Sequence, residues 1–232
     1  MALVKTKRDS ESVKESTGNS KYLTKPGFYD VEVLAAIANQ GKGDSLVIDF
    51  FIDHDGQKQP LYGNLRILNN NGEENKIGMS LFNKLLVIQD LDEAEDPEEV
   101  VLPIGKNGVD KDVAIIPNLT EFPVTLQLNI EYSVYDGSIQ EKKIIRNFFR
   151  ASDHATAAEI VNEVDTVGEQ YTKDVTYFES SDTKGYIYKD NLNAEIVEKW
   201  IKDNRPKGTI SNTSAQTVKK PSFAKKKRFG AK

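Results

Sequence analysis

The stretch from Gly27 to Arg150 alternates between apolar runs and turns, and the order of its elements constrains the fold more than any other feature. Five segments show the two-residue alternation or the β-branched and aromatic content of strands. A block between the third and fourth of them carries apolar residues at helical spacing. The predicted strands are residues 27–37, 45–52, 59–68, 124–135 and 139–150, and the predicted helix is residues 76–88.

Two Asp-Gly pairs indicate how these strands connect. Asp55-Gly56 stands between the second and third strands, and Asp136-Gly137 stands between the fourth and fifth. Asp-Gly is a strong signal for a tight hairpin, so each pair of strands should be adjacent and antiparallel. Three strands, a helix and a final hairpin follow the element order of the OB-fold, a five-stranded Greek-key barrel. We therefore predict a mainly β chain with an OB-like barrel over residues 26–150.

The barrel region contains one long insertion. Residues 90–99 are strongly acidic and predict a solvated loop. Residues 100–122 contain two prolines and two glycines, which predict an inserted loop with one or two short strands.

Composition changes on both sides of the barrel. Residues 1–25 are polar and charged with almost no periodicity, which predicts a flexible arm. Residues 151–204 predict a partly helical extension that packs on the barrel. From residue 205 to 232 the chain is rich in Lys, Ser, Thr and Gly, which predicts a disordered basic tail.

Within the extension the pattern predicts three segments. Ser152 or Asp153 is placed to cap a helix that runs to about residue 164. Residues 165–190 are mixed and rich in tyrosine, and we expect an extended segment lying on the barrel. Residues 193–202 predict a short helix with Trp200 on its apolar side.

The net charge of −5 hides a strong asymmetry along the chain. Residues 205–232 carry nine basic residues and no acidic one, whereas residues 27–204 have a net charge of −17. An acidic body does not bind nucleic acid over its whole surface. Binding would need a locally basic face, the basic tail or both.

Residue types that carry catalysis or bind metals do not occur in suitable patterns. There is no cysteine, and His54 and His154 are far apart, so neither a thiolate metal site nor a nucleophile–histidine pair is supported. Residues 90–99 lack the Asp-x-Asp-x-Asp-Gly order of a calcium loop. The residues around His54 lie on a predicted turn, where Asp is common. We expect a protein that is not an enzyme and that needs no metal or cofactor.

The hydrophobic runs bear on localisation. The longest is far shorter than a membrane span, and the first residues lack an apolar signal region. The absence of cysteine is compatible with a reducing cytoplasm. We expect an intracellular protein without membrane contact.

Aromatic and basic side chains are interleaved on the predicted strands. Simple alternation places residues 142, 144, 146, 148 and 150 on one face of the fifth strand. A site for single-stranded nucleic acid needs cations for phosphates and flat rings for unstacked bases. The alternative is that most rings belong to the core and the cations to a solvated face. We expect phosphates to contact Arg66, Lys142, Lys143, Arg146 and Arg150, and bases to stack on Tyr62, Tyr132 and Phe148.

The basic tail is a second candidate site. Phe223 and Phe229 lie among its lysines, a composition that suits an arm binding a nucleic-acid strand. The alternative is a solubilising tail that contacts the acidic body of the protein itself. The tail residues assigned to binding are Lys225, Lys226, Lys227 and Arg228.

Two patterns within residues 26–150 resemble phage OB-fold proteins that bind single-stranded DNA. One is Gly27-Phe-Tyr-Asp-Val-Glu-Val33, and the other is Leu65-Arg-Ile-Leu68 followed by the helix from Asn75 to Leu86. The resemblance implies coating and protection of single-stranded DNA, with little sequence specificity, during phage replication, recombination or repair. It also implies the cytoplasm of an infected bacterial host, and replication proteins such as a polymerase or helicase as partners.

This chain departs from that family in its last residues. Better-known bacterial members end in an acidic tail with a terminal Phe that recruits partner enzymes, whereas here the tail is basic. Recruitment by that route is therefore not implied.

Two other functions fit the sequence less well. The barrel would serve as a protein-interaction module of a replication or virion assembly without direct nucleic-acid binding, or as an accessory subunit of a nuclease. An OB barrel is only partly closed, so its edge strands would also allow two subunits to pair.

Overall fold

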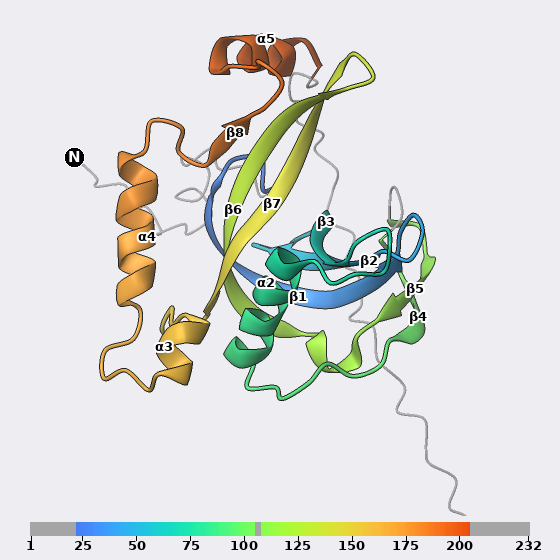
Figure 1. Ribbon diagram of the computed structural model, residues 1–232, viewed down its shortest axis with the longest axis vertical. Helices are drawn as coiled ribbons and strands as arrows, with labels where there is room; N and C mark the ends of the chain where they lie inside the picture. Colours follow the sequence, from blue (N-terminus) through green and yellow to red (C-terminus); the bar gives the residue numbers. More distant parts are fainter. Residues whose placement is uncertain (1–21, 105–107, 205–232) are drawn as a thin grey trace, which may run out of the picture.

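A computed structural model of the chain describes residues 22–104 and 108–204. Most of the predicted arm over residues 1–25 and all of the predicted tail, including Lys225–Arg228, lie outside the described residues. The described chain is mainly β, with eight strands in one sheet and a few helices (Figure 1).

Strand β1 (Gly27–Gln40) lies at the centre of the sheet. Its first half pairs antiparallel with β6 (Phe122–Tyr135), and its second half pairs antiparallel with β2 (Leu46–His54). Val33 pairs with Phe122 on one side and with Ile52 on the other. The hairpin that begins with β2 therefore lies on one edge of β1, and the hairpin that begins with β6 lies on the other edge.

Both predicted hairpins are confirmed. Asp55-Gly56 connects β2 to β3 (Gln57–Leu68), and Asp136-Gly137 connects β6 to β7 (Ser138–Arg150). All four turn residues have positive φ, between 49° and 78°. A two-residue hairpin turn with positive φ at both positions matches the twist of the strands, and Asp-Gly tolerates it well.

The predicted insertion forms two short strands. β4 (Glu98–Leu102) and β5 (Lys111–Ile115) make a hairpin that joins β1 where Ile115 pairs with Ile37. A 3-10 turn, η2 (Pro117–Leu119), leads from β5 to β6. Strand β8 (Tyr186–Tyr188) pairs in parallel with Ile130–Tyr132 of β6, on the edge opposite β7, where β1 has ended.

The sheet is open between β3 and β7. The main strand order is β3, β2, β1, β6, β7, and no backbone ladder joins its two ends within the described residues. One hydrogen bond spans the opening, from the Ile145 backbone N–H to Asn64 Oδ1 at 3.1 Å. Helix α2 (Lys76–Ile88) packs against both β3 and β7. The structure therefore shows an open sheet and not a closed barrel.

Helix α2 has the predicted bounds and covers the core at this opening. Asn75 caps its N-terminus by accepting a hydrogen bond from the Gly78 N–H at 3.0 Å. Its inner face buries four large apolar side chains against the inner faces of the strands. Those side chains are Leu81, Phe82, Leu85 and Ile88.

The C-terminal extension differs from its prediction in two places. Helix α3 is shorter than expected, Ala157–Val161, because Thr156 caps it and forms a capping box with Glu159. The extended segment predicted over residues 165–190 is wrong over Glu169–Ser180, which form helix α4, and is confirmed only at Tyr186–Tyr188, which form β8 against β6. Helix α5 (Ala194–Asn204) confirms the predicted last helix.

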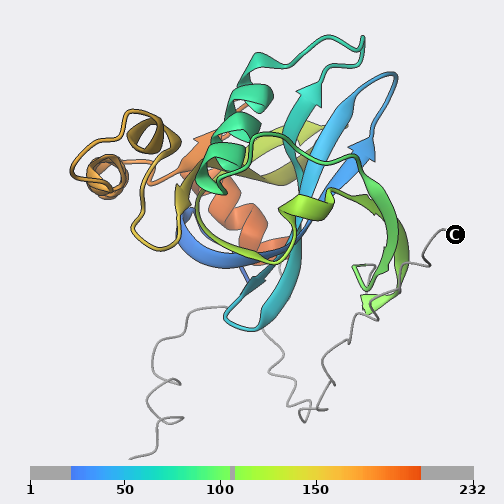
Figure 2. The same ribbon diagram turned by 90° about the horizontal axis from the view of Figure 1, so that it is seen from below.

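Helix α4 folds because it has a surface to pack on. The rings of Tyr171 and Phe178 lie two turns apart, and both contact Phe28 edge to face, at centroid distances of 5.3 and 5.6 Å. Tertiary packing of this kind stabilises a helix even where the sequence pattern of the segment predicts helix only weakly. Figure 2 shows α3 and α4 on one side of the sheet and the β4–β5 hairpin on the other.

Gly78→Ala tests the contact between α2 and β3. Helix propensity alone would favour alanine by roughly 1 kcal/mol. We expect instead a loss of about 1–3 kcal/mol in the free energy of unfolding, because a Cβ at Gly78 would lie 1.9 Å from the Arg66 carbonyl oxygen. Urea denaturation measures the change, with Ser80→Ala on the exposed side of α2 as the control. A stabilising Gly78→Ala would contradict the packing.

Candidate nucleic-acid interface

Two of the three predicted stacking residues are fully buried. Tyr132 lies beside both Tyr186 and Tyr188, whose rings are nearly parallel to its own, and meets Trp200 edge to face. Its hydroxyl donates a hydrogen bond to Glu141 at 2.8 Å. Phe148 packs edge to face on Phe50 in the main core. The prediction that bases stack on Tyr132 and Phe148 is therefore wrong.

A β-bulge explains why simple alternation assigns the last residues of β7 to the wrong face of the strand. Gln127 pairs with Asn147 and Leu128 pairs with Ile145, so Arg146 is an extra residue in the ladder. One extra residue exchanges the faces of all residues that follow it. Phe148 and Arg150 consequently lie on the opposite face of β7 from Lys142, and the predicted common face ends at Arg146.

Arg150 is bound within the protein. Its Nε and Nη2 donate to the two carboxylate oxygens of Asp153 at 2.9 and 2.7 Å. These hydrogen bonds hold the pKa of Asp153 below its ordinary value, and they raise the pKa of Arg150 further. A guanidinium paired in this bidentate way is poorly placed to bind a phosphate, and a phosphate contact at Arg150 stays a prediction.

The remaining predicted residues come together along the opening between β3 and β7. Tyr62 is 56% exposed, and Arg66, Lys142 and Arg146 are exposed. The end of the Lys142 side chain lies over Gly63, next to Tyr62. Arg66 and Arg146 flank the Asn64–Ile145 hydrogen bond on the two strands. Lys143 is the neighbour of Lys142 and lies on the other face of β7.

Strand β3 is irregular between Leu61 and Leu65. Leu61 pairs with Phe50 and Leu65 with Ile48, so three residues of β3 stand opposite Asp49 alone. Gly63 adopts a positive φ of 65°, and its N–H donates to the Asp49 carboxylate. The other Asp49 oxygen accepts from Asn39 at 2.7 Å. Asp49 is nearly buried, and burial raises its pKa despite these donors.

Tyr135, the last residue of β6, is not among the predicted stacking residues. It is 75% exposed. It pairs with Ser138, and Glu131 pairs with Lys142, so strand alternation places Tyr135 on the same face of the hairpin as Lys142. Glu131 is held in an ion pair with Lys189 at 2.7 Å. We call Tyr62, Arg66, Tyr135, Lys142 and Arg146 the seam face.

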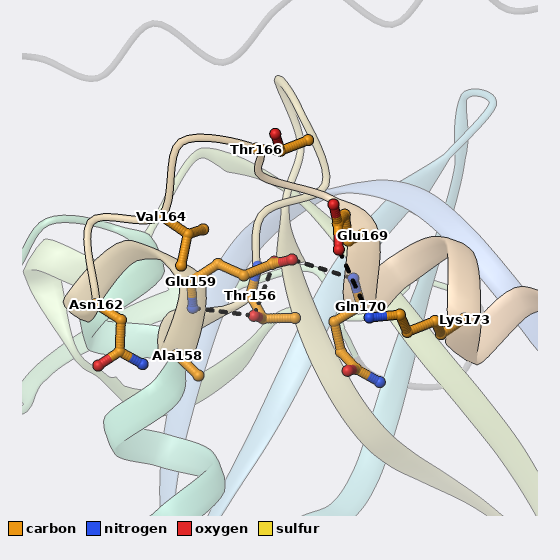
Figure 3. Close-up of a pocket in the computed structure, with 9 residues that line it drawn as sticks. All are labelled: Thr156, Ala158, Glu159, Asn162, Val164, Thr166, Glu169, Gln170 and Lys173. Carbon is orange, nitrogen blue, oxygen red and sulfur yellow. Dashed lines mark hydrogen bonds and ion pairs between the residues drawn. The ribbon is translucent and has the colours of Figure 1, made fainter.

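A hollow between α3 and α4 is closed by hydrogen bonds of the protein itself (Figure 3). One Glu159 carboxylate oxygen accepts from the Thr156 N–H and hydroxyl, and the other accepts from the Gln170 N–H. Burial would raise the pKa of Glu159, but the N–H donors outweigh it and hold that pKa below its ordinary value. These hydrogen bonds of Glu159 therefore join α3 to the start of α4.

Within residues 22–104 and 108–204, no three His, Asp or Glu side chains are grouped so that they could hold a metal ion. No helix of the described chain has the length and hydropathy needed to cross a membrane. Comparison with protein-family models, with curated proteins and with solved structures found no match to this chain.

Arg150→Ala tests the assignment of Arg150 to an internal ion pair. At pH 7 we expect the free energy of unfolding to fall by about 0.5–1 kcal/mol. The folded-state pKa of Asp153 lies below its unfolded value of about 4. The stabilisation is therefore present above about pH 4 and is lost as the pH falls through the folded-state pKa. Urea denaturation at neutral and acidic pH measures both effects. A difference that persists unchanged at about pH 2 would contradict the ion-pair assignment.

Proposed function

We propose that this chain is a single-stranded DNA-binding protein without enzymatic activity and that DNA lies along the seam face. One observation carries the proposal. Two exposed tyrosines and three exposed cations lie on neighbouring strands of a protein whose body is otherwise acidic. Exposed rings stack on bases regardless of sequence, and cations contact phosphates. Little sequence specificity follows from the same chemistry.

The strand pairing supports an OB-like fold for the same region. β1 pairs with β2 and β6, β2 with β3, and β6 with β7, which leaves only the β3–β7 pairing to close a five-stranded barrel. The Asn64–Ile145 hydrogen bond and helix α2 lie at that closing edge. We infer an OB-like barrel that is incompletely closed, with the β4–β5 hairpin as an insertion. OB barrels are often partly open and bind single strands across such a face.

The dimensions suit a short stretch of single-stranded DNA. From Ser138, opposite Tyr135, to Arg146 the face extends over about 25 Å at the rise of a β-strand. That length suits the lower part of the range of about 4–16 nucleotides bound by one OB-fold. The basic residues Lys225–Arg228 would add contacts to phosphates beyond the seam face, which makes binding more sensitive to salt. Such a protein would coat and protect single strands during phage DNA replication, recombination or repair.

Tyr62→Ala and Tyr135→Ala test the stacking role. Each loses one stacked base, worth about 1–3 kcal/mol, so we expect affinity for single-stranded DNA to fall about 5- to 150-fold. Fluorescence anisotropy with a labelled DNA of about 30 nucleotides measures it. Tyr177→Ala is the matched control, because Tyr177 is as exposed as Tyr135 but lies on α4. Equal effects of the three substitutions, or equal affinity for duplex DNA, would contradict the proposal.

Arg146→Ala tests the phosphate contacts. Binding of single strands depends on salt with a log–log slope of about −0.7 for each phosphate neutralised. Loss of one contact should therefore make the slope shallower by about 0.7. Lys173→Ala on α4 is the control, because that lysine is ion-paired to Glu169 away from the seam face. An unchanged slope for Arg146→Ala would remove Arg146 from the site.

A further inference from the structure

Helix α2 exposes apolar surface on the side turned away from the core. Met79 and Val87 are only partly buried, and Ile77, which does not line the hollow described below, is 82% exposed. The outer face of an amphipathic helix normally carries charged residues of both signs. In α2 the only charged residues are Lys76 and Lys84, although the body of the chain is strongly acidic.

Helix α3 lies beside this face and completes a hollow. Its Ala157 and Ala158 are small and leave room next to α2, and Val161 beyond them is 66% exposed. The two helices line an open hollow of about 630 Å³. Five aliphatic and six polar or charged residues line it, and a hollow of this size accommodates two or three side chains of a bound segment.

The charge around the hollow favours an acidic occupant. Lys76 and Lys84 both line it, and Glu74 is the only carboxylate that does. Among residues 22–104 and 108–204, neither lysine has a carboxylate oxygen within 4.0 Å. Charges at the edge of a binding site give specificity and faster association with a ligand of opposite charge.

We propose that the hollow between α2 and α3 binds a short acidic peptide segment of a partner protein, with aliphatic or aromatic anchors. Nucleic acid fits less well, because no aromatic residue lines the hollow and bases would have nothing to stack on. Residues 205–232 of this chain fit less well too, because they carry nine basic residues and no acidic one. This inference does not depend on DNA binding at the seam face.

The hollow and the seam face use different residues. Gly78 of α2 rests on the Arg66 backbone, so the helix supports β3 from one side while its other side forms the hollow. Because none of the seam-face side chains lines the hollow, a partner peptide and single-stranded DNA would bind at the same time.

A random dodecapeptide library displayed on phage, selected on the immobilised full-length chain, tests the proposal. Peptides that also bind Val161→Asp are removed before each round. We expect the enriched peptides to carry more Asp and Glu than the unselected library, together with two or more large apolar residues. Synthesised with a fluorescent label, an enriched peptide should bind about tenfold or more weakly to Val161→Asp. Lys84→Glu should weaken it as well.

Controls separate this site from the seam face. Val101→Asp places the same charge on a similarly exposed valine of β4 and should leave peptide binding unchanged. Val161→Asp should leave affinity for single-stranded DNA unchanged. The proposal is overturned if no peptide is enriched, if enriched peptides are basic, or if Lys84→Glu leaves their affinity intact. Loss of DNA binding by a folded Val161→Asp would assign the hollow to nucleic acid instead.

Discussion

One side-chain amide joins the two ends of the sheet. Asn64 accepts a hydrogen bond from the Ile145 N–H, and it is in position because three residues of β3 bend outward opposite Asp49. Asp49 in turn binds the Gly63 N–H that this bend leaves without a ladder partner. A nearly buried carboxylate and an amide thus replace the backbone pairing that would otherwise close β3 onto β7. Gly63, within this bend, lies under Lys142 and next to the exposed Tyr62.

The position of an aromatic residue along strand β6 decides whether its side chain is buried or exposed. Tyr132 and Tyr135 lie on the same strand three residues apart, so alternation sends them to opposite faces. One is enclosed by β8 and α5, and the other stands in solvent next to the Asp136-Gly137 turn. The acidic body then confines the attraction for phosphates to the few places where cations gather. The seam face is one such place.

Local sequence signals predicted the parts of the fold that local chemistry decides. The two Asp-Gly turns, helix α2 and the order of the long strands follow from residues that are neighbours in the chain. The bulge at Arg146 could not be predicted, because it exists only in the pairing of β7 with β6. Helix α4 could not be predicted either, because Tyr171 and Phe178 fold against the distant Phe28. Arg66, Lys142, Arg146 and Tyr62 lie along the opening between β3 and β7, whereas Tyr132 and Phe148 are buried and Arg150 follows the bulge.

Hydrogen–deuterium exchange of the full-length chain, with and without single-stranded DNA, tests the seam face most directly. The account predicts slower exchange in peptides that cover residues 61–66 of β3 and residues 138–147 of β7 when DNA is bound. Exchange in helix α4 should stay the same. Protection that is confined to α4 or to the β4–β5 hairpin, or no protection in the described chain at saturating DNA, would contradict the account.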